Sequence, residues 1–203
     1  MGVRKGEPWG APGALPDDGV IVRSDAEARH VLTEARRDNQ PFPTLGLLGG
    51  DLCRTLGGGR GGDERLRSPD AMTFPVDVGE VLVDGRLHLF VAHLVARTRW
   101  WTRAFVAMNA QFVGDLDLGP RAHPGDGLLD TYDARLPVSQ LLHVRARART
   151  GSHLPHPAIE ERRTGALQVE LERPLAVWLD GDRIGAGRVL SVRVDADALR
   201  VVV

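Results

Sequence analysis

The sequence predicts an α+β fold in which a small βαβα unit precedes a β-rich region. Near the N-terminus, two short apolar runs are each followed by a turn and a helical pattern, which is the minimal piece of a parallel α/β layer. From Thr73 onward the pattern changes to many short apolar runs separated by turns. Such runs at regular spacing indicate a sandwich or an open barrel.

The chain opens with a segment rich in glycine, proline and charge, residues 1–19, which predicts an irregular arm. Residues 20–22 are typical of a short buried strand. Ser24-Asp25 then offers a helix N-cap, and apolar residues at helical spacing predict a helix over residues 26–37. Asn and Pro residues end this helix, so the first strand–turn–helix step is complete by residue 43.

The second step follows the same plan. Residues 44–48 predict a strand, and Gly49-Gly50-Asp51 opens a short helix. Residues 57–70 are rich in glycine and predict a flexible linker. No Gly-Lys-Ser/Thr follows these glycines, which excludes a P-loop.

In the β-rich region, Asp84-Gly85 and Asp180-Gly181-Asp182 lie between apolar runs and predict tight hairpins. One helix is predicted there, over residues 137–149, with Leu141, Leu142 and Val144 on its buried side. The strands are predicted over residues 74–82, 86–95, 103–114, 128–135, 166–171, 175–179, 189–194 and 200–203.

The composition limits the classes of function. The formal net charge is −1, so the whole chain has no basic footprint for nucleic acid. Cys53 is the single cysteine, which excludes an internal disulfide and fits a reducing, cytoplasmic compartment. The sequence contains neither an N-terminal apolar signal segment nor a long apolar span, so any membrane contact would be peripheral.

Several stretches carry a resemblance to a known family. Residues 106–130 combine an alternating apolar run, a Gly- and Pro-rich link, and the segment Asp126-Gly127-Leu128-Leu129-Asp130. Residues 43–56, residues 178–190 and Val76-Asp77-Val78-Gly79 match further family segments. Together these stretches resemble the diacylglycerol kinase family of lipid kinases, which includes bacterial lipid kinases and sphingosine kinases, and the similarity is greatest in the C-terminal β-sandwich domain.

The resemblance implies three parts: the arm, a truncated remnant of the nucleotide-binding domain with its linker at residues 20–70, and a lipid-kinase-like β-sandwich domain at residues 71–203. Since 19 residues precede the first strand, we expect about half of the family's nucleotide domain to be missing. A second chain, either another copy or a partner protein, could complete it.

The resemblance also implies roles for particular residues if the chain is active with ATP and Mg²⁺. Asp180 matches the carboxylate thought to act as general base. Asp25, Gly49, Gly50 and Asp51 match the nucleotide loops, where glycine amides at helix N-termini hold phosphate. The Asp126 carboxylate and the Leu128 carbonyl match an oxygen-ligand metal site, to which His123 is a weak addition.

The sequence departs from the family at these same positions. Arg23-Ser24-Asp25-Ala26-Glu27 stands where a Gly-Gly-Asp-Gly-Thr loop is expected, so the glycines that admit phosphate are missing. His123 and Gly125 stand where the family usually has carboxylates. We therefore expect ATP-dependent lipid phosphorylation to be weakened or lost and a lipid- or protein-binding role to be retained; an active lipid kinase is the alternative.

A tryptophan pair and three histidines have both structural and functional interpretations. Trp100-Trp101 lies among arginines, which is typical either of a membrane interface or of a strand edge with one tryptophan buried and one exposed; we favour the strand edge. His153 and His156 fit a surface loop better than a metal pair. His93 alternates with apolar residues and is predicted to be a surface or hydrogen-bonded core histidine.

Overall fold

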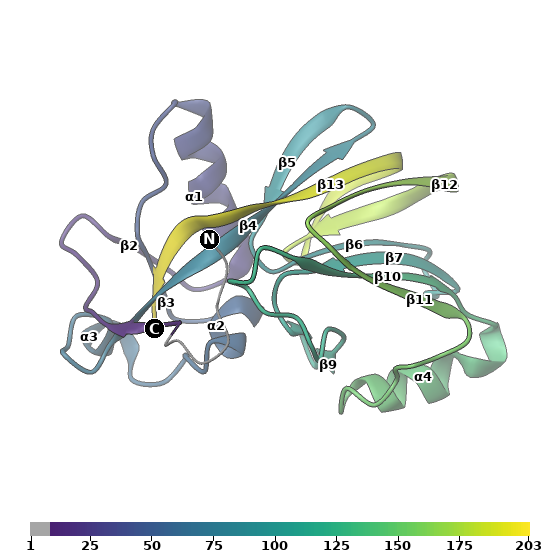
Figure 1. The fold of residues 1–203 in the computed structure, drawn as a ribbon, viewed down its shortest axis with the longest axis horizontal. Coiled ribbons are helices and arrows are strands. Elements are labelled where there is room, and N and C mark those ends of the chain that lie inside the picture. The colour runs from purple at the N-terminus through teal and green to yellow at the C-terminus, as the bar shows by residue number, and fades with distance from the viewer. Residues whose placement is uncertain (1–8) are drawn as a thin grey trace.

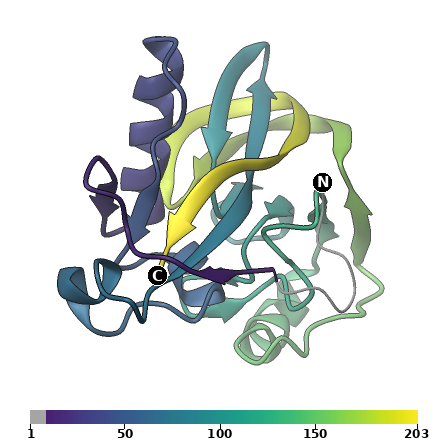
Figure 2. The same ribbon diagram turned by 60° about the vertical axis from the view of Figure 1, so that its left-hand side comes forward.

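The structure, a computed structural model, describes residues 9–203 (Figure 1). The arm's residues 1–8 lie outside the described part. The centre of the fold is β13 (Asp182–Val202), a strand of 21 residues that bends along its length (Figures 1 and 2). β13 pairs antiparallel with β12 (Ala166–Leu179) and with β4 (Met72–Val83), and its last residues pair in parallel with β3 (Leu45–Leu47). One strand therefore connects the α/β part to the β-rich part.

The described strands form one large curled sheet and one small sheet. In the large sheet the neighbours follow the order β1-β4-β13-β12-β6-β7-β10-β11, while β5 pairs with β4 and β2 pairs with β3. The remaining strands are β1 (Ala11–Pro12), β2 (Val20–Val22), β5 (Arg86–Phe90), β6 (His93–Arg97), β7 (Arg103–Met108), β10 (Leu129–Arg135) and β11 (Ile159–Thr164), with β8 (Phe112–Val113) and β9 (Leu116–Asp117) in the small sheet.

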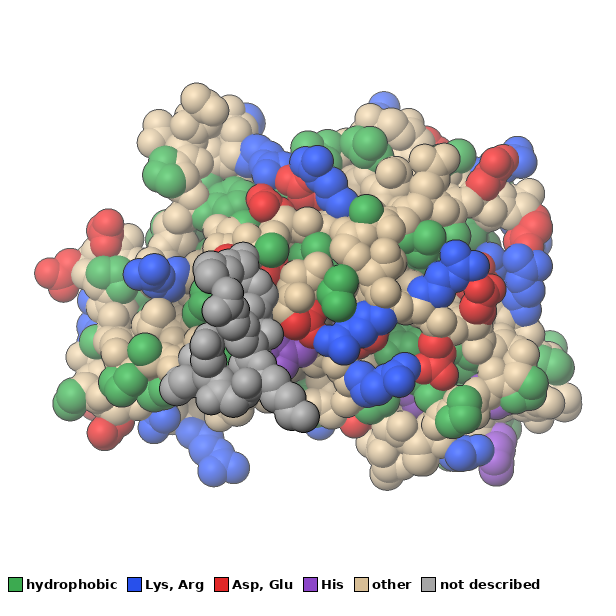
Figure 3. Space-filling model, in the orientation of Figure 1, with side chains coloured by type: hydrophobic (Ala, Val, Ile, Leu, Met, Phe, Trp, Pro, Cys, Tyr) green, Lys and Arg blue, Asp and Glu red, His purple; other side chains and the backbone are tan. Residues whose placement is uncertain are grey.

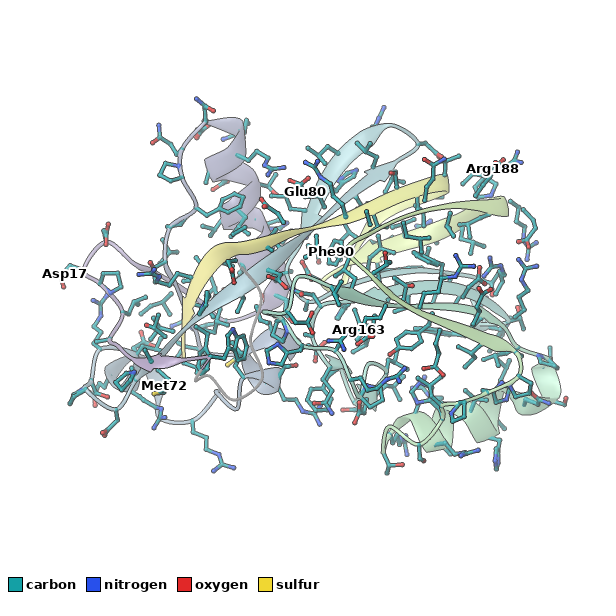
Figure 4. All side chains as sticks on the ribbon, viewed as in Figure 1. Asp17, Met72, Glu80, Phe90, Arg163 and Arg188 are labelled. Carbon is teal, nitrogen blue, oxygen red and sulfur yellow. The ribbon has the colours of Figure 1, made fainter. Side chains whose placement is uncertain are left out.

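The chain therefore has the predicted α+β class with a β-sandwich in its C-terminal part. Alternating residues of the strands point into the sandwich, where Phe90, Phe105 and Leu179 are fully or almost fully buried (Figure 4 labels Phe90). A second core lies where helices cover β3 and β4, and it contains Leu32 and Leu52.

Four helices and one 3₁₀ turn are described. α1 follows Ser24, whose side chain accepts a hydrogen bond from the Glu27 amide as an N-cap. Glu80 of β4 is buried between α1 and the sheet, where it pairs with Arg36 and Arg193 (Figure 4). The bounds are α1 (Asp25–Arg37), α2 (Asp51–Thr55), α3 (Gly62–Leu66), η1 (Val138–Gln140) and α4 (Leu141–Ala148).

Two segments predicted to be loops have regular structure. The linker at residues 57–70 contains α3, because Leu66 is buried against Leu15 and Ala71 and fixes the segment to the body. Residues 159–164, for which no strand was predicted, form β11 in a full antiparallel ladder with β10, and His153 in the loop before it is buried and not at the surface. Local composition missed both, since tertiary contacts far along the chain decide them.

Other boundaries also differ. The two predicted strands 166–171 and 175–179 are one strand, β12, with a bulge between Glu170 and Leu175. The predicted strand over residues 86–95 is two strands, because the chain bends at residues 91–92. Leu142, predicted to be buried, is 82% exposed, whereas Val144 is buried as expected.

No helix within residues 9–203 is long and apolar enough to cross a membrane. The arm is not wholly irregular, because Ala11 and Pro12 pair with β4 as β1. Trp9, just before β1, packs on Phe74 and donates a hydrogen bond to the Pro75 carbonyl at 3.0 Å. Trp9 therefore packs on the body of the protein.

Candidate functional site

A cluster of three carboxylates and one imidazole lies where α1 and α2 meet the sandwich. Asp25, Asp51, His93 and Asp180 come from four different elements and are all buried or half-buried. The structure thus brings together four predicted site positions, Asp25, Gly50, Asp51 and Asp180, and adds His93.

Asp180 occupies the first position of the tight Asp-Gly turn between β12 and β13, with φ of 53°. Its side chain is fully buried, and it turns back into the protein to the bend between β5 and β6. Its carboxylate accepts backbone hydrogen bonds from Val91 at 3.0 Å, Ala92 at 2.8 Å and His93 at 3.1 Å. Burial raises the pKa of Asp180, although the charge of His93 and these amides oppose the rise.

Asp25 is the first residue of α1, but its carboxylate caps a different helix. It accepts hydrogen bonds from the amides of Asp51 at 2.5 Å and Leu52 at 3.2 Å, the first two residues of α2. Burial, followed by the nearby charge of Asp180, raises the pKa of Asp25 to about 7. The donors that a phosphate would use at the start of α2 are therefore already occupied by the chain itself.

The paired glycines before α2 allow this close approach. Gly50 has φ of 98°, and a Cβ atom there would overlap the Asp25 carboxylate. A Cβ atom on Gly49 would lie 2.5 Å from the Arg23 carbonyl oxygen. Both glycines have a packing role that requires no bound anion.

Asp51 and His93 form the second half of the cluster. The His93 Nε2 atom lies 3.0 Å from Asp51 Oδ2, and the Gly114 amide donates to the same carboxylate at 3.0 Å. Burial alone would raise the pKa of Asp51, but the His93 hydrogen bond and the Gly114 amide lower it below its usual value. Burial alone would lower the pKa of His93, yet Asp51 and the charge of Asp180 raise it. Both shifts favour the ionised forms of the pair, the Asp51 carboxylate and the His93 imidazolium.

Arg29 of α1 supplies a second positive charge. Its Nη2 donates to Asp182 at 2.6 Å, and its Nε lies 4.0 Å from Asp180. Sequence reasoning missed Arg29 and Asp182, and it gave His93 no role in the site. Asp182 is the third residue of the predicted Asp-Gly-Asp turn, but its partner Arg29 is 153 residues away in sequence, so no local pattern links the two.

Asp25, Asp51 and His93 are the one set of three or more metal-ligand side chains in the described part of the chain whose ligand atoms lie within 4.8 Å of one another. They fit Mg²⁺ poorly. Mg²⁺ prefers an octahedral shell of oxygens, whereas one ligand here is an imidazole that already pairs with Asp51. Both Asp25 oxygens also accept from backbone amides. No chemical step through Mg²⁺ follows from this arrangement.

The other predicted metal site lies apart from this cluster. The Asp126 carboxylate accepts from the Leu128 amide at 3.0 Å and forms an ion pair with Arg163, which Figure 4 labels. The His123 ring instead packs against Trp9 at a tilt of 52°, with ring centroids 4.3 Å apart, and it accepts a hydrogen bond from the Gly125 amide. Arg163 therefore neutralises Asp126, while the His123 ring is engaged elsewhere.

Gly125, where the family usually has a carboxylate, also has a local explanation. A Cβ atom at this position would overlap the Trp9 indole. The glycine thus makes room for the segment that precedes β1.

A curled β-sandwich preceded by a small α/β layer, with carboxylates gathered where the two meet, is the architecture of a lipid-kinase-like protein. Residues 73–203 match the model of the YegS C-terminal NAD kinase beta sandwich-like domain, and the chain belongs to this family. No curated protein matches the chain.

Solved structures give the same fold. One solved structure, of a "putative" diacylglycerol kinase from Bacillus anthracis strain Sterne, matches with a TM-score of 0.69 at 15% sequence identity. The match covers 91% of this chain and 77% of the chain in that structure. A second solved structure, of a diacylglycerol kinase from the same strain, matches with a TM-score of 0.61 at 15% identity and covers 91% of this chain and 75% of the chain in that structure. The chain thus has a diacylglycerol kinase-like fold, and likeness at this identity speaks for the fold alone.

Proposed function

We propose that this chain is a degenerate, non-catalytic member of the lipid kinase family, in which ATP-dependent phosphorylation is weakened or lost and a lipid-binding role is retained. The observation that carries the loss of ATP binding is the Asp25 carboxylate at the start of α2. A phosphate there would meet a carboxylate instead of free amide donors. Asp180 supports the same conclusion, since a fully buried carboxylate with three amide donors cannot reach a lipid hydroxyl.

A cavity beneath α4 supports the retained lipid-binding role. It has a volume of about 70 Å³ and is lined almost entirely by apolar side chains, among them Val106, Leu136 and Val144. Two of its lining residues, Tyr132 and His153, have buried polar atoms without a hydrogen-bond partner in the described structure. A cavity of this size has room for only a few methylene groups, so it would take the end of an apolar chain and is too small for a nucleotide.

The test is a thermal-shift titration with ATP and Mg²⁺, with Mg²⁺ alone as the control. A ligand at 100 times its Kd would stabilise the fold by about 2.7 kcal/mol. In a chain of this size that corresponds to roughly 5–10 °C. We expect an unchanged melting temperature, and a shift of several degrees that requires ATP would contradict the proposal.

The convergence of Asp25, Asp51 and Asp180 favours one alternative, an active lipid kinase whose nucleotide site is completed by a partner chain. In this alternative, Asp25, with its pKa of about 7, could accept a proton from a lipid hydroxyl. Transfer of labelled phosphate from ATP to mixed lipids, abolished by Asp25→Asn in a variant that keeps the wild-type circular dichroism spectrum, would establish this alternative. We expect no transfer by the chain alone.

A further inference from the structure

Helix α4 and the 3₁₀ turn before it each expose a large apolar side chain, and one of them, Leu142, was predicted to be buried. Leu142 is 82% exposed and Val138, in the preceding 3₁₀ turn, is 74% exposed. Val144 and Ala148 hold the opposite flank of α4 on the protein. Val138, Leu142, Arg145 and Arg149 recur at spacings of three or four residues, so they lie along one flank of the helix.

The β6–β7 hairpin continues this flank. Trp101 packs in the same apolar cluster as Leu141 and Val144, which places the hairpin tip beside α4. Trp100 at the tip is 68% exposed. Arg97 lies close enough to Arg145 for their charges to interact, so the two elements share one surface.

We use the name α4 face for the surface formed by Arg97, Arg99, Trp100, Val138, Leu142, Arg145 and Arg149. Figure 3 shows apolar, basic and histidine side chains side by side over the region of α4, at the lower right. Three of the five exposed large hydrophobic side chains of the described residues belong to it.

The charge on the α4 face is unbalanced. Within residues 9–203, salt bridges link none of its arginines to a carboxylate, whereas the nearby Arg103 and Arg135 are paired with Asp133 and Glu172. The Arg97 guanidinium instead lies over the rings of Trp178 and Trp101, at 4.2 and 4.8 Å from their centroids, and that of Arg99 lies 5.2 Å from the Trp100 centroid. Such stacking keeps the cations beside rings that favour a water–lipid boundary.

The geometry points to the α4 face as a docking surface for an anionic lipid bilayer, which gives the lipid-binding role proposed above its partner. Trp100, Leu142 and Val138 would enter the headgroup region, while the arginines would contact lipid phosphates. The cavity beneath α4 would then lie on the side of the helix away from the bilayer. The inference depends on the lipid-binding part of the proposed function and is independent of whether the chain binds ATP.

Co-sedimentation with vesicles tests the inference, using phosphatidylcholine alone and phosphatidylcholine with 30% phosphatidylserine. We expect binding to the anionic vesicles that weakens as salt rises. Arg145→Gln with Arg149→Gln should weaken it about 30-fold, at roughly fivefold for each arginine. Trp100→Ala with Leu142→Ala should weaken it at least about tenfold through lost apolar insertion.

Matched control variants distinguish binding through the α4 face from non-specific effects of losing charge or apolar surface elsewhere. Arg60→Gln with Arg65→Gln removes two exposed arginines near α3, and Leu87→Ala removes a side chain 49% exposed on β5. Both control variants should bind like the wild type, and all variants should keep its circular dichroism spectrum. The inference would be overturned if the wild type did not bind anionic vesicles, or if the two α4-face variants bound them as tightly as the wild type. ATP binding in the thermal-shift assay would refute only the loss of the nucleotide site.

Discussion

Replacement of Asp180 by alanine distinguishes a structural carboxylate from a catalytic base. The carboxylate accepts from three buried amides, those of Val91, Ala92 and His93. Each buried donor left without an acceptor costs about 1–3 kcal/mol. We therefore expect Asp180→Ala to lower the free energy of unfolding by about 3–5 kcal/mol, a large part of the 5–15 kcal/mol typical of a domain.

The chain contains a matched control in the Asp84-Gly85 turn between β4 and β5. Asp84 has φ of 47°, close to the 53° of Asp180, so alanine is strained to a similar degree at both positions. The Asp84 carboxylate also accepts from two amides, those of Arg188 and Val189, but these lie at the surface, where water can replace it. We expect Asp84→Ala to cost about 1–2 kcal/mol.

Urea unfolding followed by tryptophan fluorescence and circular dichroism measures both variants. The comparison depends on the difference between them, because strain in the turn and effects on the unfolded chain largely cancel. If Asp180→Ala proves no more destabilising than Asp84→Ala, the reasoning is refuted and Asp180 is free for chemistry.

Three further predictions concern the same region and the linker. Because the folded-state pKa of Asp25 is raised from 3.8 to about 7, the folded protein binds the extra proton in this range. The free energy of unfolding should therefore fall as pH rises from about 4 to 7, by up to roughly 4 kcal/mol from this group. Urea unfolding at several pH values should show a shallower fall for Asp25→Asn than for the wild type. An equal fall in both proteins would contradict the assignment. Gly50→Ala should destabilise the fold by about 2–4 kcal/mol, because the new side chain is strained and overlaps Asp25. The control is Gly59, which also has a positive φ, of 87°, but faces open space. Gly59→Ala should therefore cost only about 1 kcal/mol. Leu66→Ala should lower the free energy of unfolding by about 2–4 kcal/mol and speed proteolysis of the linker. Leu142→Ala, at an exposed position, should change it by less than about 0.5 kcal/mol. An unchanged rate of cleavage in Leu66→Ala would show that α3 does not depend on Leu66.

The sequence predicted the order of the elements well because their signals are local. The Ser24 cap, the helix behind it and the Asp-Gly turns are each set by neighbouring residues. Two errors have a common cause. Leu66 lies among glycines and charges, so only its contact with Leu15 and Ala71 explains why α3 is ordered. Leu142 fits the helical apolar pattern, but the protein surface beneath α4 accommodates only one flank.

The candidate site was predictable as a set of positions, but not as an arrangement. Asp25, Asp51 and Asp180 were named from the resemblance, and they do converge. Their hydrogen-bond partners could not be deduced, because the donors to Asp180 come from a bend 87 to 89 residues away in sequence. His93 alternates with apolar residues like any strand residue, so its pairing with Asp51 had no local signal.

The arrangement also shows how acidic side chains can gather at one place and be engaged in structural hydrogen bonds. A general base needs a free lone pair and access to the proton that it removes. In this chain the lone pairs are largely used internally: Asp25 caps α2, Asp180 holds the bend before β6, and Asp51 binds Gly114 and His93. These bonds connect α1 and α2 to the sandwich at the point where β13 alone joins the two parts within the sheet. Loss of any one carboxylate should therefore loosen that junction, and stability rather than turnover is the property that its removal should change first.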